Sequence, residues 1–287
     1  MAFVLENEQM RLECVARAGE IQHFFDKEKN VELMYQGDEG WSGKNPTLFP
    51  IIGSTHTGSY EIDGKTYSMK NHGLIRYADL DGKVTDDAIV FTYDSNDDTR
   101  AQYPFDFHYE MKYWLEDKKL HIDYTVVNTG DKEMPFTFGL HPAFRVPQFE
   151  GEKFEDYSID YEYEEVATQM VFDPKMEKPV EYPTVEFKSW NLNREDIDKY
   201  ATIVYKDLKS TYVTLSCKGE GRVRVHFPDF PLLAIWSHPS RSNFICIEPW
   251  YGHADFEKVD VPFEKREGTM MLKPGETFKT NYIIEAL

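Results

Sequence analysis

Apolar and polar residues alternate with a period of two along most of this chain. The clearest runs cover residues 88–94, 105–116, 119–128, 210–217, 222–227 and 278–287. This period puts every second side chain on the same face of a β-strand. Turn residues separate the runs at 116–118, 128–130, 219–221 and 273–275. The pattern predicts an all-β fold of mainly antiparallel strands, as a sandwich or a barrel.

Signals for other kinds of structure are few. Residues 193–201 begin with Asn193 as a helix N-cap and carry acidic residues in the first turn, which predicts one short helix. Residues 156–166 alternate aromatic and acidic residues, as a half-exposed strand does, and residues 172–183 contain three prolines, as a surface connection does. Without a repeat or a linker, we expect residues 1–287 to form a single domain.

The net charge limits the kinds of partner that we expect, and the cysteines indicate the redox state of the compartment. A net charge of −19 argues against nucleic acid and anionic membranes as partners, because both attract basic surfaces. The N-terminus lacks a signal-peptide pattern, and no apolar run approaches the ~20 residues of a membrane span. Cys14, Cys217 and Cys246 are widely spaced, so we expect reduced, mostly buried thiols. We expect a soluble cytoplasmic protein, monomeric or homodimeric.

The first candidate for chemistry is His141, in the segment FTFGLHPAF at 136–144. Pro142 disfavours helical geometry at His141, and the aromatic residues around it place the imidazole beside apolar side chains. A histidine with a pKa near neutrality can hold a proton and release it. The alternative interpretation is a core histidine whose ring binds a backbone carbonyl.

The second candidate is Glu248, which follows the apolar run Phe244–Ile247 and precedes Pro249 and Trp250. We expect the strand to end here and to leave the carboxyl group at its end. A carboxylate beside buried apolar residues costs free energy unless it is paired or functional, and its raised pKa suits a general base. The alternative interpretation is a structural salt bridge with Arg76 or Arg241.

Several further residues are candidates for binding a substrate. His72 lies in NHGLIR at 71–76, a turn that also presents Arg76, whose guanidinium can bind two hydroxyls or a carboxylate. Asp255 can bind a sugar hydroxyl or cap a turn. Trp236 and Trp250 suit stacking against a sugar ring, although either can belong to the core.

Motifs for other chemistries are missing from the sequence. It has no HExxH, CxxC, P-loop, GxSxG or GxGxxG pattern, so we expect no metal and no cofactor. A glycoside hydrolase needs two carboxyl groups at its site, and pairing Glu248 with Asp255 would leave His141 without a role.

With these residues in view, the sequence resembles the aldose 1-epimerase (galactose mutarotase-like) family, in particular the branch associated with bacterial lactose and galactose operons. Five segments carry the resemblance, in the family's order: NPTLFPIIG at 45–53, NHGLIR, YPFDFHYEMKYWL at 103–115, FGLHPAF, and WSHPSRSNFICIEPWYGHAD at 236–255. The sequence departs from true galactose mutarotases in lacking a clear counterpart of the substrate-binding aspartate before the glutamate segment. This departure leaves the preference for galactose open.

The resemblance implies a large β-sandwich with a sugar in a cleft on one face. It implies that His141 is the general acid toward the ring oxygen and Glu248 the general base on the anomeric hydroxyl, with His72 and Arg76 binding the substrate. The expected function is interconversion of the α and β anomers of an aldohexose or a hexose phosphate. A sugar-binding protein without turnover and a glycan-degrading enzyme remain as alternatives. From sequence alone, the acidic limb of the pH profile would be assigned to Glu248 and the basic limb to His141.

Overall fold

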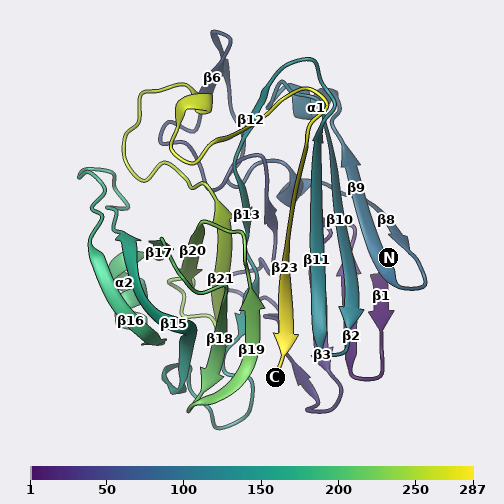
Figure 1. Ribbon diagram of the computed structural model, residues 1–287, viewed down its shortest axis with the longest axis vertical. Coiled ribbons are helices and arrows are strands. Elements are labelled where there is room, and N and C mark those ends of the chain that lie inside the picture. Colours follow the sequence, from purple (N-terminus) through teal and green to yellow (C-terminus); the bar gives the residue numbers. More distant parts are fainter. Residues whose placement is uncertain (1) are drawn as a thin grey trace.

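Two of the four sheets account for most of the strands in the computed structural model, which describes residues 2–287 (Figure 1). The smaller of these two runs in the order β1 (Ala2–Glu6), β2 (Met10–Val15), β3 (Ile21–Asp26) and β4 (Val31–Glu32). Two further pairs are β6 (Tyr60–Ile62) with β7 (Lys65–Tyr67), and β12 (Met134–Phe136) with β22 (Met270–Leu272).

The large sheet has 15 strands and divides into two halves joined by one long strand. The first half runs in the order β5 (Thr47–Leu48), β13 (Phe138–Leu140), β21 (Phe244–Tyr251), β20 (Leu232–Trp236) and β17 (Thr202–Lys206), and β14 (Ala143–Arg145) also pairs with β21. The second half runs in the order β18 (Tyr212–Cys217), β19 (Glu220–His226), β23 (Thr277–Ala286), β11 (Lys119–Asn128), β10 (Phe107–Glu116), β9 (Ala88–Asp94) and β8 (Asp81–Val84).

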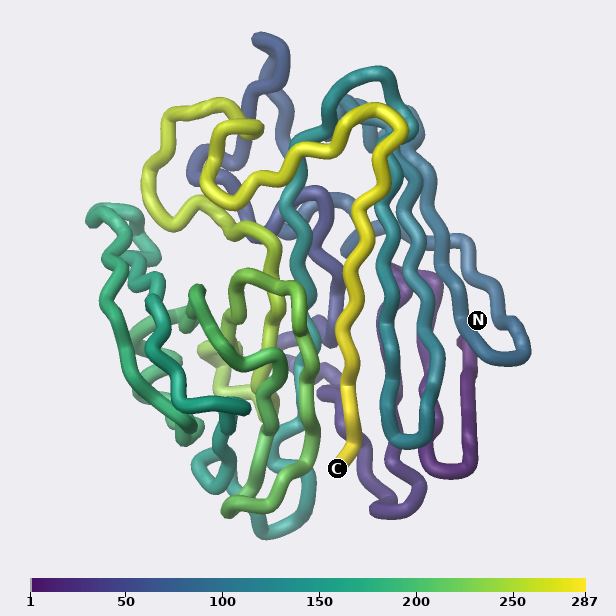
Figure 2. Tube along the Cα trace, in the orientation of Figure 1, coloured from purple at the N-terminus to yellow at the C-terminus, as the bar shows by residue number. Residues whose placement is uncertain are grey.

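The joining strand is β15 (Tyr157–Met170), which changes its partner along its length. Residues 157–161 of β15 pair with β18, and residues 168–170 pair with β17. On its other edge, β15 pairs with β16 (Thr184–Asn191). In Figure 2 the chain of β15 lies on the left of the view, beside β16. The sheet therefore bends across β15 instead of remaining one flat layer.

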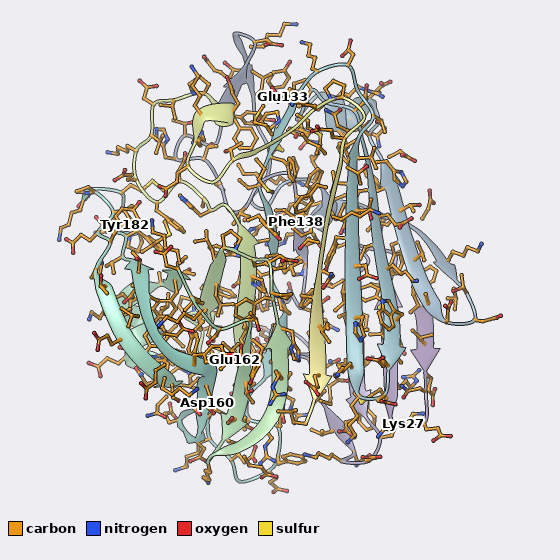
Figure 3. The ribbon with its side chains drawn as sticks, viewed as in Figure 1. Lys27, Glu133, Phe138, Asp160, Glu162 and Tyr182 are labelled. Carbon is orange, nitrogen blue, oxygen red and sulfur yellow. The ribbon has the colours of Figure 1, made fainter. Side chains whose placement is uncertain are left out.

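The main core lies between the two halves of the large sheet. Tyr124 of β11 and Phe138 of β13 meet there, with ring centroids 5.1 Å apart. Figure 3 shows Phe138 inside the molecule, whereas the labelled Lys27 and Glu133 lie near its opposite ends. The hairpin β10–β11 illustrates why these residues form strands, since alternate residues such as Tyr109 and Met111 are buried and the residues between them are partly exposed.

Helix is limited to short segments within residues 2–287. The α-helices are α1 (Asp97–Arg100) and α2 (Arg194–Tyr200), and the 3-10 turns are η1 (Ile75–Tyr77), η2 (Phe154–Asp156) and η3 (Phe263–Lys265). The predicted N-cap is confirmed, because Asn193 Oδ1 accepts the backbone N–H of Asp196 at 2.7 Å. No helix in this part of the chain combines the length and the apolar character that a membrane span needs.

The prediction of an all-β sandwich is confirmed. Strands β9 and β11 have the predicted bounds, and the alternating run at 156–166 belongs to the longer β15. The three cysteines are free thiols and buried, as expected. The expected end of a strand at Glu248 is wrong, since β21 continues to Tyr251 and Glu248 lies within it.

Candidate active site

Glu248 reaches the site because side chains alternate along β21. Ile245 and Ile247 point into the main core, and Cys246, Glu248 and Trp250 belong to the opposite face of the sheet. Connecting segments cover that face, and Phe172 and Phe256 stack there with centroids 4.1 Å apart. The fold therefore holds the Glu248 carboxyl group under cover, with a side-chain exposure of 2%.

His141 lies beside Glu248 because the chain leaves the sheet at this point. One edge of β21 pairs with β14 at residues 244–246 and with β13 at residues 250–251. His141 and Pro142 connect β13 to β14 and fill the gap between these two ladders. Pro249 falls in the same gap, so its lack of an N–H costs no ladder hydrogen bond on this edge.

The two groups face each other closely. His141 Nε2 and Glu248 Oε1 are 3.5 Å apart, and both side chains are buried. Within the described residues, His141 Nδ1, Glu248 Oε2 and Trp250 Nε1 are buried polar atoms without a hydrogen-bond partner. Because buried polar groups in native proteins are almost always paired, these atoms are available to a bound polar molecule.

Burial shifts both pKa values toward the uncharged forms. Desolvation raises the pKa of Glu248 well above 4.5, although the side chain of Trp250 and the charge of Arg76 act in the opposite direction. Desolvation lowers the pKa of His141 well below 6.5, and His72 and Arg76 lower it further. Burial therefore favours a protonated carboxyl group and a neutral imidazole in this pair.

His72 adds a hydrogen-bond donor to the site. Its backbone is left-handed, with φ of 69°, and Gly73 follows with φ of 78°. His72 Nδ1 accepts the backbone N–H of Gly53 at 3.0 Å. Desolvation, helped by Arg76, lowers the pKa of His72 to about 3, so the ring is neutral and carries its proton on Nε2.

These residues line a cavity of about 350 Å³. This volume lies in the range of small-molecule sites. The structure brings His141, Glu248, His72, Arg76, Trp236 and Trp250 together around this cavity. The Trp236 ring meets the His141 ring edge to face, with centroids 5.2 Å apart. One of the two suggested partners of Glu248, Arg241, instead pairs with Asp198 at 2.8 Å.

Asp255 does not line this cavity. Its Oδ2 accepts the backbone N–H of His56 at 2.8 Å and also pairs with Arg266. Asp255 lies instead in a neighbouring pocket of about 180 Å³, which shares Ala254 and Phe256 with the cavity. The carboxylate is thus already engaged by protein groups.

Sequence reasoning missed five polar or aromatic residues of the lining, namely Trp41, Asn71, Thr202, His238 and Phe256. Trp41 and His238 lie in connecting segments, where no periodic pattern indicates the direction of a side chain. Asn71 directly precedes His72, which was a candidate. Its position beside His72 in the sequence was the one signal that could have indicated Asn71.

Cys246 gives the site the donor set of a metal centre. Ligand atoms of His141, Cys246 and Glu248 all lie within 4.8 Å of one another. An imidazole, a thiolate and a carboxylate are ligands that zinc accepts. Desolvation, followed by the charge of Glu248, raises the pKa of the Cys246 thiol well above its usual range. A metal would therefore have to displace protons from both Cys246 and Glu248.

Comparisons with known proteins match the chain over nearly its whole length. The family model described as aldose 1-epimerase matches residues 1–285. The plasmid-encoded Protein LacX of Lactococcus lactis subsp. lactis is 31% identical over 304 residues, with both chains fully covered.

Two solved structures are also similar. A galactose mutarotase related enzyme from Lactobacillus acidophilus has a TM-score of 0.93 and 30% identity, covering 100% of this chain and 97% of the other. A galactose mutarotase-like protein from Lactobacillus casei ATCC 334 has a TM-score of 0.91 and 28% identity, with both chains fully covered. The chain belongs to the aldose 1-epimerase family.

Proposed function

We propose that this protein is an isomerase that interconverts the α and β anomers of an aldohexose or a hexose phosphate. The observation that carries the proposal is the buried pair of His141 Nε2 and Glu248 Oε1, 3.5 Å apart beside the cavity. Membership of the aldose 1-epimerase family supports the reaction class. Two proton-transferring side chains suffice for this chemistry.

The reaction needs two proton transfers for ring opening and two for closure. His141 donates a proton to the ring oxygen while Glu248 accepts the proton of the C1 hydroxyl. The bond between C1 and the ring oxygen breaks, and C1 becomes an aldehyde. Rotation about the C1–C2 bond exposes the other face of the carbonyl. The C5 hydroxyl then attacks C1 and returns its proton to His141, while Glu248 reprotonates the C1 oxygen.

The electrostatics of the pair suit this cycle. Ring opening starts with imidazolium and carboxylate and leaves a neutral imidazole and a protonated carboxyl group. Burial favours that neutral combination, which therefore matches the open-chain stage. One proton transfer between His141 and Glu248 converts one combination into the other without changing the net charge. The charge of Arg76 lowers the pKa of Glu248 and so helps form the carboxylate.

The remaining residues of the cavity supply binding groups. Arg76 and the Nε2–H of His72 donate hydrogen bonds, and Trp236 presents an aromatic surface to the cavity. Sugar hydroxyls can also pair with the orphaned Glu248 Oε2 and Trp250 Nε1. A hexose in this cavity thus satisfies polar groups that the protein leaves unpaired.

The test is a panel of freshly dissolved single-anomer sugars and sugar phosphates followed by polarimetry. The panel includes galactose, because two solved relatives are described as galactose mutarotase related or galactose mutarotase-like. We expect the wild-type protein to accelerate equilibration of at least one sugar above the buffer rate. Saturable binding without acceleration of any sugar would favour a non-catalytic sugar-binding protein.

A further inference from the structure

Trp41 covers the His141 ring although it lies far from His141 in the sequence. The Trp41 and His141 rings stack with centroids 5.4 Å apart and an interplanar angle of 28°. Trp41 also stacks on Phe244 at 4.6 Å and meets Trp236 edge to face at 5.2 Å. The indole therefore fills one side of the space around the imidazole, and it contributes to the desolvation that lowers the pKa of His141.

Asp38 fixes the turn that carries Trp41. Asp38 Oδ1 accepts the backbone N–H groups of Gly40 at 2.8 Å and of Trp41 at 3.0 Å. The backbone N–H of Asp38 donates to Trp41 O at 3.0 Å, and the Tyr35 hydroxyl donates to the same oxygen at 2.9 Å. Both backbone polar groups of Trp41 are thus held, and Asp38 holds each of them.

The same carboxylate links this turn to a second loop of the cavity. The Ser242 hydroxyl donates to Asp38 Oδ1 at 2.8 Å and lies 2.8 Å from the Ser240 hydroxyl. Ser240 Oγ is in turn 2.7 Å from His238 Nδ1, and His238 lines the cavity. A chain of hydrogen bonds therefore runs from Asp38 to His238 in the lining of the cavity.

Asp38 remains an acceptor over the whole working range of pH. Desolvation alone would raise the pKa of Asp38, but its polar neighbours, Tyr35 and the backbone N–H of Trp41 foremost, lower that pKa to about 2. Asp38 is exposed and does not line the cavity. Any effect of Asp38 on the reaction must therefore pass through another residue.

We propose that Asp38 is a positioning residue that holds Trp41 against His141 and keeps water from the imidazole. The expected effect of Asp38 on turnover rests on the proposed function. The expected effect of Asp38 on the surroundings of the His141 ring rests on the geometry alone. Asp38 is thus expected to act through the Trp41 indole that covers the imidazole, without touching the sugar.

The first test uses a matched pair of substitutions at Asp38. Asp38→Ala removes the acceptor, whereas Asp38→Asn keeps an oxygen that can accept from Gly40, Trp41 and Ser242. Asp87→Ala, at an exposed aspartate beside the β8–β9 turn, serves as the control. The readout is the titration of the His141 ring by NMR, assigned by the signal that His141→Asn removes.

We expect Asp38→Ala to raise the pKa of His141, because water regains access to the imidazolium. The other titratable groups that face the ring, namely His72, Arg76, Cys246 and Glu248, are unchanged in all variants. Asp38→Asn and Asp87→Ala should titrate as the wild type does. In kinetics, Asp38→Ala should lower kcat/KM roughly tenfold and move the acidic limb to higher pH.

A double-mutant cycle with Trp41 tests whether Asp38 acts through the indole. Trp41→Ala should raise the pKa of His141 at least as far as Asp38→Ala does, and the double variant should raise it no further. Trp41→Phe keeps an aromatic cover if Trp41→Ala does not fold. An unchanged pKa of His141 in a folded Asp38→Ala variant would overturn the proposal, and so would equal damage from Asp38→Asn. If the wild type turns over no sugar, the proposed function fails while the His141 titration still decides the role of Asp38.

Discussion

Glu248 and His141 occupy positions where an ionisable side chain lowers stability. Each is buried, and within residues 2–287 each keeps one polar atom without a hydrogen-bond partner. A protein built for stability alone would fill these positions with apolar residues. Strongly shifted pKa values of two adjacent groups in a cavity are instead typical of proton-transfer sites.

The first prediction at the residue scale concerns pH. His141 and Glu248 are active while they hold one proton between them. When both groups are protonated, neither can act as the base, and when both are deprotonated, neither can act as the acid. The pKa of His141 is lowered and that of Glu248 is raised, so the acidic limb of kcat/KM belongs to protonation of His141 and the basic limb to ionisation of Glu248. Burial thus reverses the assignment expected from sequence. The limbs are properties of the coupled pair.

NMR of the His141 ring in the free enzyme checks this assignment at the pH optimum. We expect the chemical shifts of a neutral imidazole there, with the carboxyl group carrying the shared proton. An imidazolium at the optimum would contradict the assignment and restore the one based on sequence.

A second prediction at this scale concerns Arg76. Arg76→Ala should raise KM about tenfold and change kcat less than about threefold, because contacts with hydroxyls act in the ground state and the transition state alike. Arg11→Ala, on the partly exposed face of β2, is the control and should leave both constants unchanged. Steady-state kinetics with the best sugar of the panel measures both. A collapse of kcat at constant KM would assign Arg76 to the chemical step instead.

Single residues also show how far sequence reasoning reaches. His141 and Glu248 stood out because each interrupts an apolar, aromatic run. Trp41 did not stand out in the sequence. The direction of its side chain depends on the turn that Asp38 fixes, and no periodic pattern indicates it. Asp255 looked equally suitable for binding a sugar, but Arg266 and His56 engage its carboxylate, and these contacts are distant in the sequence.

At the scale of elements, the gap between the ladders of β13 and β14 creates the site. Pro249 suggested the end of a strand, because proline rarely continues a central ladder. In the structure β21 continues through Pro249, since no strand pairs with β21 at that point on this edge. Local sequence could predict the strands, but the gap depends on how three strands pair, which is a non-local property.

The turn that presents His72 gives a prediction at this scale. Gly73 has φ of 78°, and a Cβ there would lie 2.5 Å from Phe49 O, a backbone atom. Gly73→Ala should therefore destabilise the fold by more than ~3 kcal/mol and displace His72, lowering kcat/KM.

Gly64→Ala is the matched control for Gly73→Ala, because Gly64 has φ of 72° and a Cβ there would meet no atom within 4 Å. It should cost only the strain of the left-handed backbone, about 1 kcal/mol, with unchanged kinetics. Urea unfolding of both variants measures the difference. Equal destabilisation would show that the contact with Phe49 does not matter.

At the scale of the whole molecule, alternation along the chain predicted the fold class because each strand buries one face. The bend of the large sheet across β15 was beyond prediction, since it depends on β15 pairing with β18 at one end and with β17 at the other. That bend brings the two halves together over the main core and leaves the outer face of the first half free for the cavity.

The shared core leads to a prediction about unfolding. We propose that residues 1–287 form a single domain, because one hydrophobic cluster includes Leu12 of the small sheet, Tyr124 of the second half and Ile247 of the first half. Calorimetry should show one cooperative transition, with calorimetric and van't Hoff enthalpies in agreement. Two separable transitions would indicate two folding units.

The central claim is that Glu248 and His141 interconvert sugar anomers, and exchange NMR on an equilibrated sugar tests it most directly. Glu248→Gln keeps the shape of the side chain but cannot accept a proton. The control is Glu165→Gln, at an equally buried glutamate that accepts backbone N–H groups of Lys209 and Ser210 outside the cavity. We predict that Glu248→Gln lowers the rate of exchange at least ~100-fold while folding and sugar binding persist, and that Glu165→Gln, where folded, exchanges anomers as the wild type does. Near-wild-type exchange by a folded Glu248→Gln variant would contradict the account.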